Sequence, residues 1–387
     1  MGWDEALRPT SHIPVVEGAH MQIRGAVLEE IGRQRPYASS RPLTISDLEL
    51  DPPGAGEILV RMEASGVCHS DLSVVNGHRV RPVPMLLGHE AAGIVEELGE
   101  GVDDVEVGQR VVMTFLPRCG ECDACKTDGR LPCIPGTEAN NAGVLLGGGI
   151  RLHRDGDEVF HHLGVSGFAT HAVVNRKSVV PVGSDVPAAV AAVLGCAVLT
   201  GGGALLNAAA PEEGDSIAIV GLGGVGVACL LTAVASGVQE IIAVDMSEEK
   251  RELALSYGAH AAYSPEEMAE RGIKTTHAVE CAGHPAAFTT AFNATAPGGR
   301  TVTAGLPSPE QTAEISPLTI TGEARTIIGS YLGTSVPARD IPRYEQMWRE
   351  GRLPVEKLVS ATMRLDDINE AMDQLADGRA VRQIIEY

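Results

Sequence analysis

Four cysteines lie close together in the chain, and their spacing suits a metal ion. They form the pattern C-x2-C-x2-C-x7-C, at Cys119, Cys122, Cys125 and Cys133. Four thiolates saturate a tetrahedral zinc ion, so a site of this kind braces a loop and does no chemistry. Iron–sulfur proteins share C-x2-C-x2-C, but their fourth cysteine comes after three residues and precedes proline. Here it comes after seven residues and precedes isoleucine. The pattern therefore favours structural zinc over an iron–sulfur cluster, with unpaired thiols as a third interpretation.

Two other stretches carry further metal-binding residue types. Residues 66–72 read G-V-C-H-S-D-L, and residues 88–95 read G-H-E-A-A-G-I-V. A catalytic zinc has three protein ligands and one open position, and two cysteines with one histidine are a known set. Cys68 and His89 would be two of these ligands. The third must come from farther along the chain.

A glycine-rich turn at residues 221–226, G-L-G-G-V-G, follows the apolar run 216–220 and opens a predicted helix over 225–236. These glycines allow a tight turn and close approach of a pyrophosphate, which the helix N-terminus attracts. Asp245 follows the next predicted strand, where a carboxylate binds both ribose hydroxyls and repels the extra phosphate of NADP. The pattern favours NAD; a purely structural turn and a flavin site are the alternatives.

The segments that must position these residues show two kinds of sequence pattern. Between residues 21 and 197, short apolar runs are split by glycine and proline, which is typical of a β-rich, barrel-like domain. Residues 198–331 alternate strand and helix, which predicts a parallel sheet wound with helices. Residues 332–387 return to helices and end on a short strand, and residues 1–20 are an N-terminal extension. The sequence therefore predicts an α/β protein of two domains.

Composition excludes several classes of function. Lys and Arg number 30 against 51 Asp and Glu, a net charge of −21. Such a surface repels phosphate backbones and anionic lipid, so we expect neither nucleic acid nor a membrane as partner. Residues 186–211 form the most apolar window, but it is rich in Ala and Gly, and we expect a buried helix and a turn at Gly201–Gly203. The first 20 residues resemble no secretory signal, so we expect a cytoplasmic protein.

Taken together, these motifs resemble the zinc-dependent medium-chain alcohol dehydrogenases. The G-V-C-H-S-D-L loop, G-H-E-x-x-G-x-V, the four-cysteine lobe (about 117–135) and the glycine turn occur in that family's order, over about residues 21–387. The resemblance implies a GroES-like catalytic domain of residues 21–197 and 332–387. It also implies a Rossmann NAD-binding domain of residues 198–331.

The resemblance also implies roles for individual residues. At the catalytic zinc, Cys196 is the third ligand, Glu90 a carboxylate behind the metal and Asp71 the partner of His89. Ser70 takes the alcohol proton, and the substrate pocket includes Phe115 and, at its rim, His162, although a solvated His161–His162 pair is an open alternative. The residues that the resemblance assigns to the cofactor are His69, Thr200, Gly221, Gly223, Gly224, Val225, Gly226, Asp245, Lys250 and Arg382.

One residue departs from the family pattern. The proton relay continues in the best-studied members to a histidine five residues after the first ligand, where this chain has Ser73. The proton would then leave through water or through another group such as His78.

The expected activity is NAD-linked oxidation of a primary alcohol to the aldehyde, with secondary alcohols and their ketones as an extension, and the reverse reaction. Zinc holds the alkoxide while hydride passes to the nicotinamide, so the cofactors are NAD and two Zn²⁺ per chain. One alternative is oxidation of S-hydroxymethyl thiol adducts, which we disfavour because no basic residue follows Cys133 closely. Another is a non-catalytic, redox-responsive NAD- and zinc-binding protein. We expect a homodimer, with a homotetramer as the alternative.

Overall fold

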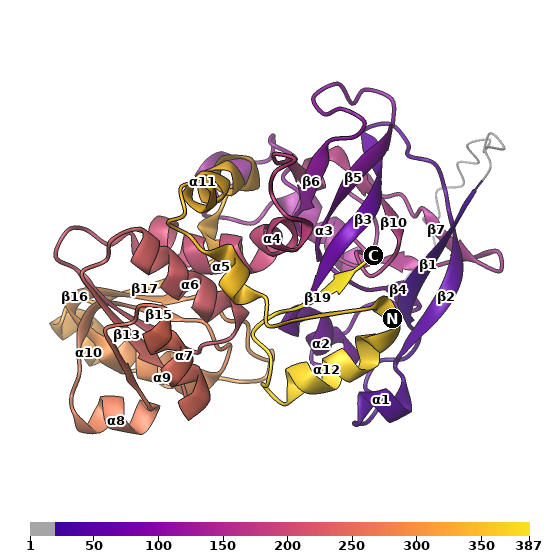
Figure 1. Cartoon of the computed structure of the whole chain (residues 1–387). Helices are drawn as coiled ribbons and strands as arrows, with labels where there is room; N and C mark the ends of the chain where they lie inside the picture. Colours follow the sequence, from indigo (N-terminus) through magenta and orange to yellow (C-terminus); the bar gives the residue numbers. More distant parts are fainter. Residues whose placement is uncertain (1–19) are drawn as a thin grey trace, which may run out of the picture.

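A computed structural model describes residues 20–387, which form a β-rich part and a part built on a parallel sheet (Figure 1). Apart from His20, the predicted extension lies outside the described residues. The predicted α/β architecture of a barrel-like domain and a wound parallel sheet is confirmed.

The β-rich part contains two sheets. The first has the order β8-β7-β2-β1-β4-β9, and the second has the order β11-β6-β5-β3-β19-β18, with β10 paired to β3. The strands of the first sheet are β1 (Met21–Leu28), β2 (Leu43–Leu50), β4 (Met85–Leu86), β7 (Leu152–Arg154), β8 (Asp157–Glu158) and β9 (Phe160–His161). Those of the second are β3 (Glu57–Val67), β5 (Glu90–Leu98), β6 (Arg110–Met113), β10 (His171–Asn175), β11 (Val179–Pro181), β18 (Ala361–Met363) and β19 (Gln383–Glu386).

The last strand, β19, completes this part from the far end of the chain. It pairs antiparallel with β3, so that Gln383 lies opposite Val67. One buried cluster joins Leu28 of the first sheet to Val67 and Ile385 of the second. The helices here are α1 (Tyr37–Ser40), α2 (His69–Val75), α3 (Ile134–Ala142), α12 (Ile368–Ala376), and the 3-10 turns η1 (Cys125–Thr127), η2 (Arg176–Ser178) and η7 (Leu365–Asp367).

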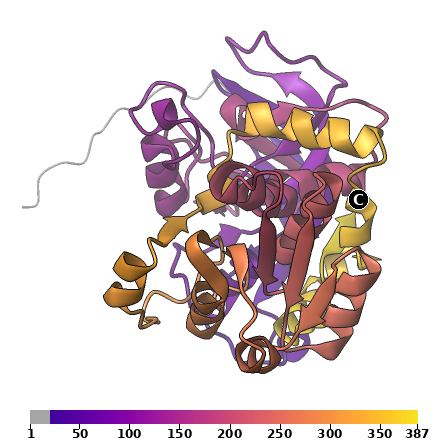
Figure 2. The same cartoon turned by 90° about the vertical axis from the view of Figure 1, so that its left-hand side faces the viewer.

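The other part has one six-stranded parallel sheet in the order β14-β13-β12-β15-β16-β17. In sequence this is strand order 3-2-1-4-5-6, the doubly wound dinucleotide-binding arrangement. Figure 2 turns this part toward the viewer. Its strands are β12 (Ser216–Val220), β13 (Glu240–Val244), β14 (Ala261–Tyr263), β15 (Thr275–Glu280), β16 (Thr295–Thr303) and β17 (Thr326–Gly329). Its helices are α6 (Gly224–Ala235), α7 (Glu248–Ser256), α8 (Pro265–Glu270), α9 (Pro285–Ala294) and α10 (Pro317–Gly322).

A long apolar helix runs between the two parts, where Figure 1 labels α4 and α5. It comprises α4 (Ala188–Val193), the π-helical η3 (Leu194–Val198), α5 (Leu199–Gly203) and the π-helical η4 (Ala204–Ala209). Residues 188–209 are long and apolar enough to cross a membrane, but 89% of the most apolar window is buried inside the protein. The prediction of a buried helix is therefore confirmed.

The predicted turn at Gly201–Gly203 is wrong, because these glycines lie inside the continuous helix. A Cβ on Gly201 would lie 2.2 Å from the carbonyl oxygen of Val225, and one on Gly203 would lie 2.3 Å from that of Gly333. The glycines thus serve close packing of the helix against α6 and against η5 (Tyr331–Thr334). The chain then continues through α11 (Pro337–Arg349) and η6 (Val355–Leu358) to the final strands.

Candidate active site

Three candidate metal ligands from distant parts of the sequence converge in the interior. Cys68 precedes α2, His89 lies between β4 and β5, and Cys196 lies in the π-helical segment η3. All three are buried, and their ligand atoms lie within 4.8 Å of one another. The π-helical turn, a feature frequent at functional sites, places Cys196 with its Sγ 3.6 Å from His89 Nε2. Two sulfurs and one imidazole nitrogen in this arrangement fit a catalytic zinc.

Asp71 holds the histidine in place. Its Oδ1 accepts from His89 Nδ1 at 3.0 Å and from the Gly88 amide at 3.2 Å, while its Oδ2 accepts from the Cys68 amide at 3.2 Å. The carboxylate therefore fixes the tautomer of His89 and leaves Nε2 free to face the two sulfurs. His162 Nδ1 lies 3.2 Å from the same Oδ1 but without hydrogen-bond geometry.

The charges of this cluster favour a thiolate at Cys68, whereas they raise the pKa of Cys196 and of His89. The neighbouring Cys196 side chain holds the pKa of Cys68 well below its ordinary value, and the charge of Arg382 acts in the same direction. Burial opposes charge on Asp71, but His89 and His162 together keep its pKa below its usual value. A thiolate at Cys68 and a carboxylate at Asp71 are the forms that a zinc site requires.

A narrow pocket adjoins the cluster. Its lining residues are Ser70, Val74, Arg79, Arg81, His89, Phe115, His162, Leu163, Leu306 and Tyr331. The free volume is about 30 Å³. Phe115 meets the His89 ring edge to face at 5.6 Å and the Tyr331 ring at 5.8 Å. The structure thus brings Ser70, Phe115 and His162 together at this pocket. The alternative of a solvated His161–His162 pair is wrong, because both rings are buried.

Neither Ser73 nor His78 lines this pocket. The Ser73 hydroxyl donates to the carbonyl oxygen of His69 at 2.7 Å, and His78 is exposed.

Glu90 and Arg382 form a buried pair behind the cluster. Arg382 Nε lies 3.2 Å from Glu90 Oε1, and Arg382 Nη1 donates to the carbonyl oxygen of Val67 at 3.1 Å. Burial raises the pKa of Glu90 to about 7, although the charge of Arg382 opposes the shift. Neither carboxylate oxygen of Glu90 has a hydrogen-bond partner among residues 20–387.

The glycine turn has the geometry expected of a phosphate site. Gly221 has φ of +93°, and a Cβ there would lie 2.7 Å from Ala282. A Cβ on Gly226 would lie 1.8 Å from the carbonyl oxygen of Gly221, whereas Gly223 faces open space. Gly223 caps α6, and Gly224 and Val225 are its first residues, so the amides of this helix end are free for an anion.

The other predicted cofactor residues border this turn or the cluster. Asp245 directly follows β13, and its carboxylate accepts from the Leu222 amide at 2.7 Å and from the Ser247 amide at 2.9 Å. Lys250 lies in α7, and His69 is the exposed first residue of α2. Thr200 is buried one helical turn after Cys196, on the same long helix.

Three residues near Asp245 and the sheet edge were not expected from the sequence: Arg251, Leu306 and Tyr331. Arg251 Nη1 donates to the carbonyl oxygens of Asp245 and Met246, both at 2.9 Å, which puts a cation beside the expected ribose site. A second cavity of about 480 Å³ opens at the carboxyl ends of β15, β16 and β17, and Leu306 and Tyr331 line both cavities. The only signal for Leu306 and Tyr331 was their position shortly after β16 and β17, whereas Arg251 lies within α7.

The four remaining candidate ligands form a cluster in the lobe. The sulfurs of Cys119, Cys122, Cys125 and Cys133 lie within 4.8 Å of one another, and no disulfide joins them. Backbone amides donate to two of the sulfurs, from Cys119 to Cys133 and from Cys122 to Cys119. Backbone hydrogen bonds lower the pKa of Cys122 to about 6. Four converging sulfurs with amide donors fit a closed structural zinc site.

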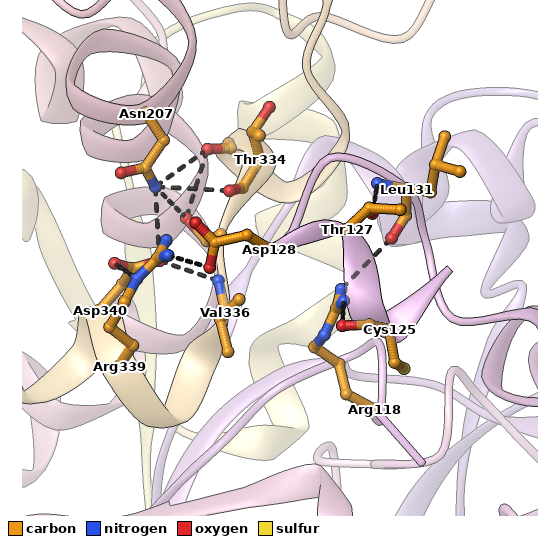
Figure 3. A network of polar contacts seen from close by, with 12 residues as sticks. Arg118, Cys125, Thr127, Asp128, Leu131, Asn207, Thr334, Val336, Arg339 and Asp340 are labelled. Carbon is orange, nitrogen blue, oxygen red and sulfur yellow. Dashed lines mark hydrogen bonds and ion pairs between the residues drawn. The ribbon is translucent and has the colours of Figure 1, made fainter. Parts of the chain in front are cut away.

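Figure 3 shows how the lobe is attached. Arg118 donates to the carbonyl oxygens of Cys125 at 3.2 Å and Leu131 at 3.3 Å, which closes the lobe on itself. Asp128 accepts from Arg339 Nη1 at 2.6 Å, and Arg339 pairs with Asp340 in α11. Because Asp128 is largely exposed, this outer ion pair adds little stability.

Comparison with known proteins agrees with this geometry. Residues 54–184 match the model of the alcohol dehydrogenase GroES-like domain, and residues 224–350 match that of the zinc-binding dehydrogenase. Alcohol dehydrogenase 1 of Pisum sativum is 33% identical over 95% of this chain and 98% of its own length. An S-(hydroxymethyl)glutathione dehydrogenase of Escherichia coli is 32% identical over 91% of this chain and 98% of its own.

Solved structures share the whole fold. Benzyl alcohol dehydrogenase of Acinetobacter calcoaceticus superimposes with a TM-score of 0.86, at 29% identity, over 95% of this chain and 99% of that one. More distant structures of the fold hold NADP, in a dehydrogenase of Sinorhizobium meliloti (23% identity, TM-score 0.77, 95% and 100% covered), or NAD, in an acetophenone reductase of Geotrichum candidum (25%, 0.74, 95% and 97%). The chain belongs to the zinc-dependent medium-chain alcohol dehydrogenase family, whose members oxidise small alcohols.

Proposed function

We propose that this dehydrogenase oxidises primary alcohols, and secondary ones that fit, with NAD as acceptor and two zinc ions per chain. The observation that carries the proposal is the position of the Cys68–His89–Cys196 cluster. His89 forms both part of the cluster and part of the pocket wall, where Ser70 lies. A substrate oxygen in that pocket therefore lies against a metal-binding face and a hydroxyl together.

The metal ligands and two of the pocket residues have separate roles in this proposal. Cys68, His89 and Cys196 hold the catalytic ion, which when bound supplies a Lewis acid that lowers the pKa of the alcohol. Ser70 accepts the proton at its Oγ. Phe115 narrows the pocket and excludes water.

Water is the group we propose to take the proton onward. The hydroxyl of Ser73 already donates to a backbone carbonyl, and His78 does not line the pocket. A substrate proton held by Ser70 thus has no side-chain relay at the position where the best-studied family members have one.

The preference for NAD rests on Asp245. The glycine turn from Gly221 to Gly226 would hold the pyrophosphate, together with Arg382 and His69, and Thr200 would border the nicotinamide, which would supply the hydride acceptor. Asp245 and Lys250 would bind the adenosine ribose. The cations of Lys250 and Arg251 in α7 would favour an extra phosphate, and the carboxylate of Asp245 opposes it.

The test combines a rate with a metal count. Purified protein with NAD and a series of aliphatic and aromatic primary alcohols should produce NADH, read at 340 nm, and a zinc chelator should abolish the rate. Metal analysis should give about two zinc per chain. Cys68→Ala should reduce this to one and stop turnover, whereas Cys229→Ala, a buried cysteine of α6 outside both clusters, should retain both ions.

The alternatives make different predictions in the same assay. Turnover only with formaldehyde premixed with thiols would assign the protein to S-hydroxymethyl adducts, the substrate named for the Escherichia coli relative. Two zinc ions without turnover of any alcohol would favour a non-catalytic NAD- and zinc-binding protein. We keep a cytoplasmic homodimer as part of the proposal, and light scattering on the purified protein decides between dimer and tetramer.

A further inference from the structure

Two arginines line the substrate pocket. Arg79 and Arg81 lie in the segment that follows α2, and both line the same cavity as Ser70 and His89. The other side chains around that cavity are aromatic, aliphatic or imidazole, and none is a carboxylate. The pocket therefore places two guanidinium groups near a candidate metal site without an acidic residue among its lining.

Neither guanidinium has an ionic partner within residues 20–387. Arg81 makes one side-chain hydrogen bond, from Nη1 to Asn141 Oδ1 at 2.6 Å, and its Nε is buried without any acceptor. Arg79 uses only its backbone amide, which donates to the carbonyl oxygen of Ser73 at 2.8 Å. By contrast, Arg154 pairs with Glu29 at 2.5 Å and Arg349 pairs with Asp185 at 2.7 Å.

This arrangement is unexpected in so acidic a chain. With a net charge of −21, carboxylates are available in excess to neutralise any arginine. Two like charges close to one cavity repel each other, and a buried donor without an acceptor is unfavourable. Both penalties are relieved when an anion enters the pocket, because a guanidinium offers several N–H donors that match the two oxygens of a carboxylate.

We propose that the pocket selects alcohols that carry an anionic group, and that Arg79 and Arg81 bind this group. The inference rests on the proposed alcohol oxidation and names its substrate class. A carboxylate is the expected anion, since its planar pair of oxygens suits the guanidinium fork. The pocket of about 30 Å³ is smaller than an aromatic ring, so a substrate with a short chain or one ring between carboxylate and carbinol also needs the adjoining cavity of about 480 Å³, which shares Leu306 and Tyr331 with it.

The test compares matched alcohols. 4-(Hydroxymethyl)benzoate should exceed 4-methylbenzyl alcohol and 4-(hydroxymethyl)benzamide in kcat/KM by roughly 10- to 100-fold, the range expected for hydrogen bonds to a charged group. Arg81→Gln and Arg79→Gln should each remove most of this advantage, because they should lower kcat/KM for 4-(hydroxymethyl)benzoate far more than kcat/KM for 4-methylbenzyl alcohol. Arg61→Gln, on β3 and paired with Glu96 at the surface, is the matched control and should change neither ratio.

A binding measurement separates recognition from turnover. 4-Methylbenzoate, which has the carboxylate but no hydroxyl, should bind the zinc-loaded enzyme in calorimetry at least tenfold tighter than 4-methylbenzamide. Arg81→Gln should abolish the difference, whereas Arg81→Lys should keep part of it.

The outcomes distinguish this inference from the proposed function. Equal kcat/KM for the charged and neutral alcohols, with no effect of either variant, would overturn the anionic substrate class while alcohol oxidation stands. An Arg81 that only braces Asn141 would lower the stability of the variant but leave the ratio of the two alcohols unchanged, which also overturns it. Absence of turnover with every alcohol, with carboxylate binding intact, would contradict the proposed function alone. A further comparison tests whether the anion can belong to a thiol. The formaldehyde adduct of 3-mercaptopropionate should then react in preference to that of 2-mercaptoethanol.

Discussion

The substitution Asp71→Asn tests the site most directly, because it changes one oxygen to an NH₂ group and leaves the shape intact. The carboxylate accepts from three donors: Oδ1 serves Gly88 and His89, and Oδ2 serves the Cys68 amide. An asparagine has a single acceptor oxygen. If that oxygen faces His89, its NH₂ group meets the Cys68 amide, so two donors oppose each other in a fully buried position.

We expect this substitution to lower both the stability of the fold and the affinity for the metal. A buried donor without an acceptor costs about 1–3 kcal/mol, and the free energy of unfolding should fall by that amount. The orientation of His89 is also weakened, and loss of a partner behind a metal ligand typically lowers metal affinity about 10- to 100-fold. In free energy this is about 1.4–2.8 kcal/mol at the Cys68–His89–Cys196 site.

The assay is competition with a coloured zinc chelator. Asp71 belongs to the Cys68–His89–Cys196 site and not to the lobe, so the zinc bound by the lobe cysteines serves as an internal reference in the same sample. Asp104→Asn is the matched control, since Asp104 is an exposed partner of Arg176, and its loss should change stability by less than about 0.5 kcal/mol. If Asp71→Asn retains two zinc ions with unchanged affinity and unchanged stability, Asp71 is not the group that orients His89.

Three further predictions concern other parts of the chain. Asp245→Ala should reduce the preference for NAD over NADP by roughly 10-fold or more, because a charged hydrogen bond to the ribose is lost; an unchanged ratio of kcat/KM values would place the ribose contact elsewhere. Cys122→Ser should lower the zinc count from two to one and the melting temperature as well, yet leave the catalytic site loaded; loss of both ions would show that the two sites depend on each other. The Asp373 carboxylate accepts from the Ala38 amide at 2.9 Å and from Arg35 at 3.0 Å. The pKa of Asp373 lies below its usual value because these hydrogen bonds outweigh the effect of burial. Asp373→Asn should therefore cost about 1 kcal/mol at pH 7. This difference in stability should shrink once the pH falls below the usual aspartate pKa of about 3.9, and it should vanish below the lower pKa of Asp373 in the folded protein. Urea unfolding of both proteins at several pH values measures it.

What the sequence predicted well depends on short spacing along the chain. The four lobe cysteines occupy fifteen consecutive positions, and the glycine turn occupies six, so their geometry is almost wholly local. Cys196 was different. Nothing in its spacing from Cys68 links the two, and only the family resemblance supplied it, because the contact depends on how a long helix packs against β3 and β5.

The features that the sequence did not predict correctly also depend on tertiary packing. Gly201–Gly203 suggested a turn because glycine is a poor helix former, yet here tertiary packing outweighs propensity. The backbone oxygens of Val225 and Gly333 leave no room for a side chain at the first and third of these positions. Likewise Arg79 and Arg81 look like ordinary surface residues in the sequence, and only the fold turns them toward Ser70 and His89.

Arg382 shows most plainly why the two halves of the site could not be deduced separately. It directly precedes β19, and strand pairing with β3 carries it 315 positions back along the chain to Val67. A Cβ on Gly224 would lie 2.5 Å from Arg382 Nη2, so the same guanidinium that faces Glu90 also lies against the start of α6. A side chain at position 224 would therefore displace the Arg382 guanidinium. A pyrophosphate bound at that helix end would share one cation with the buried carboxylate behind the metal ligands. Because the charge of Arg382 lowers the pKa of Cys68, we expect a bound pyrophosphate to alter the electrostatic field at that thiol.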